Sequence, residues 1–110
     1  MTLFSNACTI KRAPDFSGVT RLALHPAPAL ADYLAAMRLA REQAESRLEF
    51  PMLLSWYDRD RDFEAPQHVS ECHHDPAVPG YVEYGLSHGA CLLIDIEGGR
   101  FVFIYRDAGL

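Results

Sequence analysis

The stretch ACLLIDIEGGRFVFIYR, residues 90–106, is the part of the sequence that decides the fold. Two apolar, β-prone runs flank the pair Gly98-Gly99, and glycines suit the tight turn of a hairpin because they tolerate positive φ. With this pair as the loop, Ile96 lies opposite Phe101. Side chains alternate between the faces of a strand, so one face is continuously apolar. It is formed by Leu92, Ile94, Ile96, Phe101, Phe103 and Tyr105.

The opposite face of this hairpin is mixed, with an apolar middle. It comprises Cys91, Leu93, Asp95, Val102, Ile104 and Arg106. A sheet face open to water usually has a cleaner polar pattern, so we expect this face to be covered by the N-terminal segment or by another subunit. Glu97 and Arg100 flank the turn, where an exposed ion pair contributes only about 0 to 1 kcal/mol. We interpret that pair as solvating the turn and fixing its register.

One long helix is predicted over residues 29–48, because good helix formers predominate there. Its apolar residues recur at three- and four-residue steps, and they are Leu30, Leu34, Met37, Ala40, Ala44 and Leu48. Pro51 ends the helix. Strands are expected over residues 3–10, 19–24, 52–57 and 81–86.

These elements predict a single α+β domain over residues 1–110. Its antiparallel sheet has four or five strands and ends in a three-stranded meander, formed by residues 81–86 and the hairpin, and one long helix packs on one face. In the strand over residues 52–57, strict alternation separates two sets of side chains. These sets are Met52, Leu54 and Trp56 on one face, and Leu53, Ser55 and Tyr57 on the other.

Composition argues against several classes of protein. The net charge is −5, and the ten basic residues are spread along the chain, whereas a nucleic-acid groove or an anionic membrane surface requires clustered positive charge. No run of residues reaches transmembrane length, and the N-terminus has no signal pattern. The three cysteines, Cys8, Cys72 and Cys91, lack framework spacing. This usage indicates reduced thiols in a small cytoplasmic protein, and the chain looks bacterial.

Histidines and cysteines concentrate between residues 68 and 91, where zinc could find four ligands. The candidate ligands are His68, Cys72, His74 and His88, although their spacing matches no standard motif. The ordinary alternative is a polar loop with hydrogen-bonded histidines. Cys72 or Cys91 could also act as a nucleophile beside a histidine, which requires a lowered thiol pKa and an oriented base. No cofactor is expected unless this cluster binds zinc.

Aromatic residues flank the same loop and could line a small-molecule pocket. They are equally typical of a core or a dimer interface. Glu83 stands out because a carboxylate on the apolar side of the sheet would either lie at the edge of the sheet or have a perturbed pKa. The candidate ligand-binding residues are Trp56, Tyr57, Tyr81 and Glu83.

The expected function is a non-enzymatic module that self-associates as a homodimer, through the partly apolar second face of the sheet or through an edge strand. The alternative is a small zinc- or cysteine-dependent enzyme with its site between the His68–His74 loop and the turn at His88. A small-ligand binder is a third reading. The sequence has no phosphate-binding glycine loop, nucleophile elbow or H-E-x-x-H motif, so it leaves open whether the protein is an enzyme.

Overall fold

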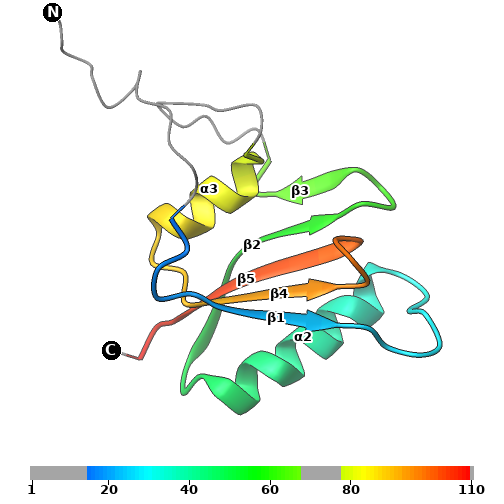
Figure 1. Ribbon diagram of the computed structural model, residues 1–110, viewed down its shortest axis with the longest axis horizontal. Coiled ribbons are helices and arrows are strands. Elements are labelled where there is room, and N and C mark those ends of the chain that lie inside the picture. The colour runs from blue at the N-terminus through cyan, green and yellow to red at the C-terminus, as the bar shows by residue number, and fades with distance from the viewer. Residues whose placement is uncertain (1–14, 68–77, 110) are drawn as a thin grey trace, which may run out of the picture.

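The computed structural model describes residues 15–67 and 78–109, and it confirms an α+β domain. Within these residues the strands are Thr20–Leu24 (β1), Pro51–Asp58 (β2), Phe63–Ala65 (β3), Leu92–Ile96 (β4) and Phe101–Asp107 (β5). The helices are Tyr33–Arg47 (α2) and Gly80–Ser87 (α3) (Figure 1). The strand predicted over residues 3–10 lies outside the described residues.

The five strands form one mixed sheet in the order β1-β4-β5-β2-β3. Strand β1 runs parallel to β4, and the other neighbours are antiparallel. The prediction of a wholly antiparallel sheet is therefore wrong. The reason is that α2 returns the chain between β1 and β2, which makes these two strands parallel, as in a crossover unit. The β4–β5 hairpin is inserted between them.

The hairpin itself has the predicted register. Ile96 pairs with Phe101 and Leu93 pairs with Ile104. Gly98 and Gly99 have φ values of 63° and 90°. Residues other than glycine rarely adopt such values.

Helix α2 covers the continuously apolar face of the sheet. Ala36, Ala40 and Ala44 are fully buried against it, and their small side chains allow the helix to lie close. The predicted apolar stripe is confirmed for Leu30, Met37, Ala40, Ala44 and Leu48, which all belong to this core. Leu34 is the exception at 52% exposure, and Ala36 takes its place against the sheet. The sheet side of this core consists of Leu92, Ile94, Ile96, Phe101, Phe103 and Tyr105.

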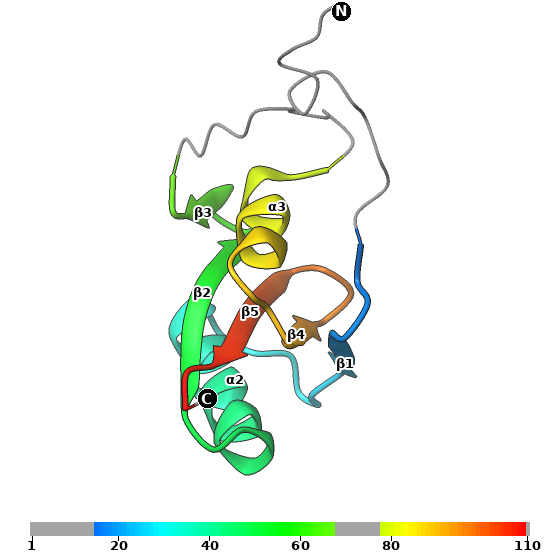
Figure 2. The same cartoon turned by 90° about the vertical axis from the view of Figure 1, so that its left-hand side faces the viewer.

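Helix α3 covers the mixed face, on the other side of the strands from α2 (Figure 2). The strand predicted over residues 81–86 is therefore wrong, and with it the three-stranded meander. The predicted long helix is present as α2, but α3 is a second helix in addition to it. Alternating apolar residues suggested a strand there, but Tyr81, Val82 and Gly85 are also spaced for one face of a helix and are buried together. The second face is covered as expected, chiefly by α3, and Phe16 and Val19 of the segment before β1 pack against the same cluster.

A bulge in β2 changes which side chains share a face. The register against β5 shifts between Leu53 and Ser55. As a result Leu53 and Trp56 pack on the α2 side, whereas Leu54 and Tyr57 pack on the α3 side. Strict alternation is therefore wrong for this strand, because one extra residue reverses the facing of everything beyond it.

Candidate functional site

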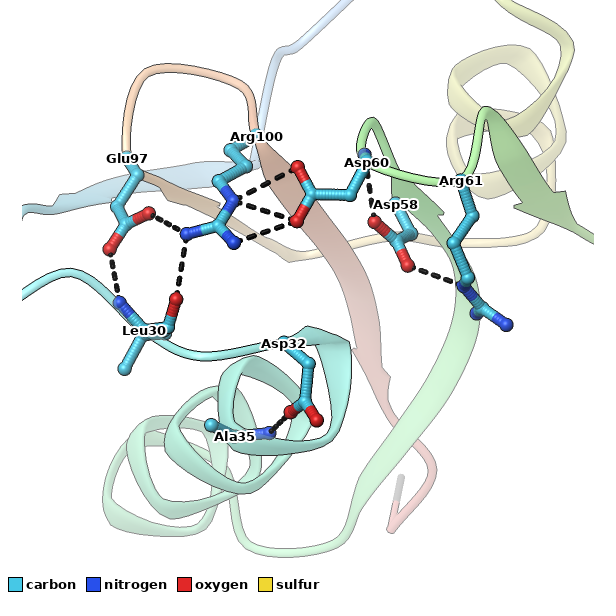
Figure 3. A network of polar contacts seen from close by, with 8 residues as sticks. All are labelled: Leu30, Asp32, Ala35, Asp58, Asp60, Arg61, Glu97 and Arg100. Atoms are coloured by element: carbon cyan, nitrogen blue, oxygen red, sulfur yellow. Dashed lines mark hydrogen bonds and ion pairs between the residues drawn. The ribbon is translucent and has the colours of Figure 1, made fainter.

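The start of α2 is held by a polar network at the β4–β5 turn (Figure 3). Arg100 donates to the carbonyl oxygen of Leu30 at 2.8 Å, and the Leu30 N–H donates to Glu97 Oε2 at 2.8 Å. Asp32 caps the helix by accepting a hydrogen bond from the Ala35 N–H at 3.1 Å. This network fixes where α2 begins over the sheet, and so it positions the side chains that α2 presents to β2.

Arg100 joins two carboxylates in this network. It contacts Glu97 Oε1 at 2.7 Å and Asp60 Oδ2 at 2.7 Å. Its hydrogen bonds lower the pKa of both carboxyls and raise the pKa of the guanidinium. The Glu97–Arg100 pair spans the turn, as predicted, but it is not an exposed pair, because the two side chains are only 14% and 18% exposed. Arg100 also ties this turn to the β2–β3 turn through Asp60.

Trp56, the first predicted ligand-binding residue, packs within a cluster of aromatic side chains. Its ring stacks on Phe103 with centroids 5.8 Å apart and on Tyr33 with centroids 5.7 Å apart. The Arg61 guanidinium lies 3.8 Å from the Tyr33 ring centroid and bonds the buried Asp58 at 2.6 Å. This cluster joins the β2–β3 turn to α2.

The other predicted ligand-binding residues lie on the opposite face of the sheet. Tyr57 stacks on Tyr81 with ring centroids 5.3 Å apart, and Glu83 lies half-buried in α3. Burial raises the pKa of the Tyr81 phenol well above its usual range. The structure therefore brings Tyr57 and Tyr81 together and separates both from Trp56, because the sheet stands between them.

Of the predicted zinc ligands, the structure describes only His88. Its Nδ1 lies 2.7 Å from the carbonyl oxygen of Tyr84, which can only accept, so this nitrogen carries the proton. The ring also stacks on Tyr84 with centroids 3.9 Å apart. His68, Cys72 and His74 lie outside the described residues, so zinc stays a prediction. Within residues 15–67 and 78–109, no three histidine, cysteine or acidic side chains form a group that could hold a metal.

Sequence reasoning missed a pocket between α2 and β2. It has a volume of about 290 Å³ and is lined by Met37, Arg41, Glu45, Pro51, Leu53 and Tyr105. Tyr105 is 4% exposed, and burial raises the pKa of its phenol, with Arg41 lowering that pKa and Glu45 raising it. The signal in the sequence was the Arg41–Glu45 spacing of four residues, which puts opposite charges on one side of a helix.

A wider, shallower groove continues from this pocket past the end of α2. It shares Glu45 and Pro51 with the pocket and has a volume of about 580 Å³. Its other lining residues include Phe50 and Met52, which are 55% and 44% exposed. The α2–β2 side of the molecule is therefore both hollowed and partly apolar.

The sequence and the fold of the chain were compared with those of known proteins. No curated protein matches it. It is similar to the solved structure of AF1514, described as a novel protein, from Archeoglobus fulgidus DSM 4304, with 21% identity and a TM-score of 0.63. The match covers 81% of this chain and 94% of that chain, and at this identity it shows the fold alone.

The described helices were also compared with the length and hydropathy that a membrane span requires, and none of them meets both. A family model, described as a domain of unknown function (DUF5619), matches residues 19–105. That range contains every strand but the last two residues of β5, together with both helices. The chain therefore belongs to the DUF5619 family.

Proposed function

We propose that this protein is a non-enzymatic interaction module that forms a homodimer through the open edge of β2. Because α3 covers the mixed face, the dimer has to use another surface. The observation that carries the proposal is an apolar sheet edge. Met52 and Phe50, two of the large apolar side chains that are most exposed in the described chain, lie at and beside this edge.

Strand β3 covers only one end of β2. It pairs with residues Trp56, Tyr57 and Asp58. Along residues 51–55, the edge turned away from β5 has no strand partner in the described part of the chain. An open edge offers backbone N–H and C=O groups to another chain. A second copy of β2, running antiparallel across a two-fold axis, can satisfy those groups.

The backbone of Phe50 is held by hydrogen bonds, while its side chain is exposed. Asp107 accepts hydrogen bonds from the Glu49 N–H at 3.2 Å and the Phe50 N–H at 3.1 Å, and the Ala108 N–H donates to the Phe50 carbonyl at 2.9 Å. The backbone of Phe50 is thus fixed while its ring is 55% exposed. An exposed aromatic residue whose backbone is already ordered loses little backbone entropy on binding.

The edge of β1 is the competing edge, and it is less suited to association. Its exposed residues are Thr20, Arg21 and Ala23, which are polar or small. The Arg21 guanidinium also lies 4.1 Å from the Phe16 ring centroid, which covers part of this aromatic side chain. The reduced thiols expected from the cysteine usage support a cytoplasmic location for the dimer.

Analytical ultracentrifugation of the full chain tests this proposal. At about 100 μM protein, a dimer with a micromolar Kd is nearly saturated. We expect the wild type to sediment as a dimer and Met52→Lys to sediment as a monomer, because a lysine on the edge opposes pairing. Met52 is 44% exposed, so this substitution leaves the core intact.

Leu34→Lys is the matched control. Leu34 is 52% exposed, but it lies in α2 and not on the strand edge. This variant is expected to remain a dimer. A monomeric wild type at the same concentration, or loss of the dimer in both variants alike, would refute pairing through β2.

A further inference from the structure

The pocket between α2 and β2 carries an inference that goes beyond self-association. Its floor is Tyr105, which is nine-tenths buried, with 4% exposure, and lines the pocket. Among residues 15–67 and 78–109 no hydrogen bond to its hydroxyl is found, and the hydroxyl oxygen is not one of the fully enclosed polar atoms, as expected for a group that faces the cavity. A phenol that lines a cavity keeps its O–H available as a hydrogen-bond donor while its ring is buried. A group that enters the pocket could accept a hydrogen bond from it.

Two opposite charges stand at the rim of the same pocket. Arg41 and Glu45 lie one helical turn apart on α2, and both line the cavity. Neither forms an ion pair with another side chain in the described part of the chain. Both side chains are exposed at the surface of α2, so each is available to a ligand.

The remaining walls are apolar. They are formed by Met37, Pro51 and Leu53. The volume of about 290 Å³ corresponds to roughly ten water molecules, which is at the small end of ligand sites. The pocket is therefore suited to a compact molecule with an apolar body and charged groups at one end.

We infer that this pocket binds a small apolar zwitterion of the amino-acid type. The Arg41 guanidinium would take the carboxylate, the Glu45 carboxylate would take the ammonium group, and the Tyr105 hydroxyl would donate to a carboxylate oxygen. The apolar part of the ligand contacts Met37 and Leu53. All of these groups come from one chain, so binding is expected in the monomeric Met52→Lys variant as well.

Titration of the full-length protein with L-leucine, followed by two-dimensional amide NMR, tests the inference. We expect saturable shifts, with a Kd of about 1 mM or tighter, centred on residues 37–45 and 51–53. Two analogues of leucine test the two charged groups one at a time. 4-Methylpentanoate lacks the ammonium group, and 3-methylbutylamine lacks the carboxylate. Each analogue is expected to bind about tenfold more weakly than leucine, because each loses one charge-assisted contact.

Conservative variants locate the site. Tyr105→Phe removes only the hydroxyl and should weaken leucine binding about fivefold to tenfold. Arg41→Gln and Glu45→Gln should each weaken it about tenfold. Arg38→Gln and Glu42→Gln are matched controls, because they are exposed on the same helix and do not line the pocket. They should bind leucine as the wild type does.

Three results would overturn the inference. One is the absence of saturable shifts up to about 20 mM leucine, a concentration well above the expected Kd. Another is binding of 4-methylpentanoate as tight as that of leucine, which would leave Glu45 without a role. The third is equal weakening by the pocket variants and by the controls on α2.

Discussion

Gly85 lies where α3 comes closest to strands β2 and β5. A Cβ atom at this position would stand 2.7 Å from Cγ2 of Ile104 and 3.2 Å from Oγ of Ser55. Ile104 is fully buried, and the Ser55 hydroxyl donates to the Tyr81 carbonyl at 2.7 Å. Neither neighbour is free to move away, so a glycine is required for helix and sheet to pack at this distance.

Gly85→Ala is therefore expected to destabilise the fold. Alanine gains about 1 kcal/mol of helix propensity over glycine, but overpacking a filled core costs about 1 to 3 kcal/mol. We expect the free energy of unfolding, measured by urea denaturation, to fall by about 1 kcal/mol. In an Ile104→Leu background, which lacks the Cγ2 methyl group, the same substitution should cost less. An equal cost in both backgrounds would show that this contact is not the cause.

Single residues also limited what the sequence could reveal about the candidate site. Trp56 and Tyr57 were expected on opposite faces, and they are, but their neighbours Leu53 and Leu54 exchange sides at the bulge. Nothing in the residues of β2 marks the bulge, because it follows from pairing with β5. Tyr105 was correctly assigned to the apolar face. Its role as the floor of a pocket depends on how far α2 stands from β2, which local sequence does not encode.

Among the elements, α2 is positioned by charge as well as by packing. The Arg100 side chain holds the Leu30 carbonyl, Glu97 and Asp60 together. These contacts join the β4–β5 turn, the start of α2 and the β2–β3 turn. The arrangement makes the stability of the fold depend on the ionisation of two carboxyls.

This dependence has a definite sign. The pKa values of Asp60 and Glu97 are lower in the folded chain than the ordinary values of about 4 that apply to the unfolded chain. Their stabilisation is therefore complete above about pH 4 and is lost as the pH falls through the folded pKa values. We expect the free energy of unfolding, measured with urea between pH 7 and pH 2.5, to decline less steeply in Arg100→Met than in the wild type. Parallel declines would exclude a contribution from this network.

Helix α3 is the element whose type was predicted wrongly from the sequence, as a strand. The run YVEYGLS supports two periods at once, because Val82, Tyr84 and Leu86 alternate while Tyr81, Val82 and Gly85 follow a helical spacing. Tertiary packing decides between them. The mixed face of the hairpin required a cover, and a helix whose Gly85 admits Ile104 provides it. The need for a cover was readable from the sequence, whereas the segment that provides it was not.

At the scale of the whole molecule, the order of the strands in the sheet could not be predicted from the sequence. The hairpin register followed from Gly98-Gly99 and was predicted correctly. The position of that hairpin between β1 and β2 depends on pairing between strands that are far apart in the sequence. No local sequence pattern predicts it. Among the described residues, this position leaves one half of β2 without a strand partner at the edge of the sheet, beside the groove along α2. The surface proposed for self-association is thus a product of topology.

If two copies pair through this edge, the sheet continues through both chains. Antiparallel pairing across a two-fold axis perpendicular to the sheet keeps the two α2 helices on the same face. Pro51 has no N–H to donate, and the bulge at Leu54 interrupts the ladder. The edge is consequently short, which favours a closed pair over open-ended stacking of strands.

Such a dimer makes the melting temperature depend on protein concentration, because dissociation accompanies unfolding. A tenfold dilution changes the free energy of dimer unfolding by about 1.4 kcal/mol, which should lower the Tm of the wild type by about 3 °C. Calorimetry across a hundredfold range of concentration measures this dependence. The Met52→Lys variant should melt at one temperature throughout, because its monomer has no partner to lose. A wild type whose Tm is equally constant would show that the two chains do not stabilise each other.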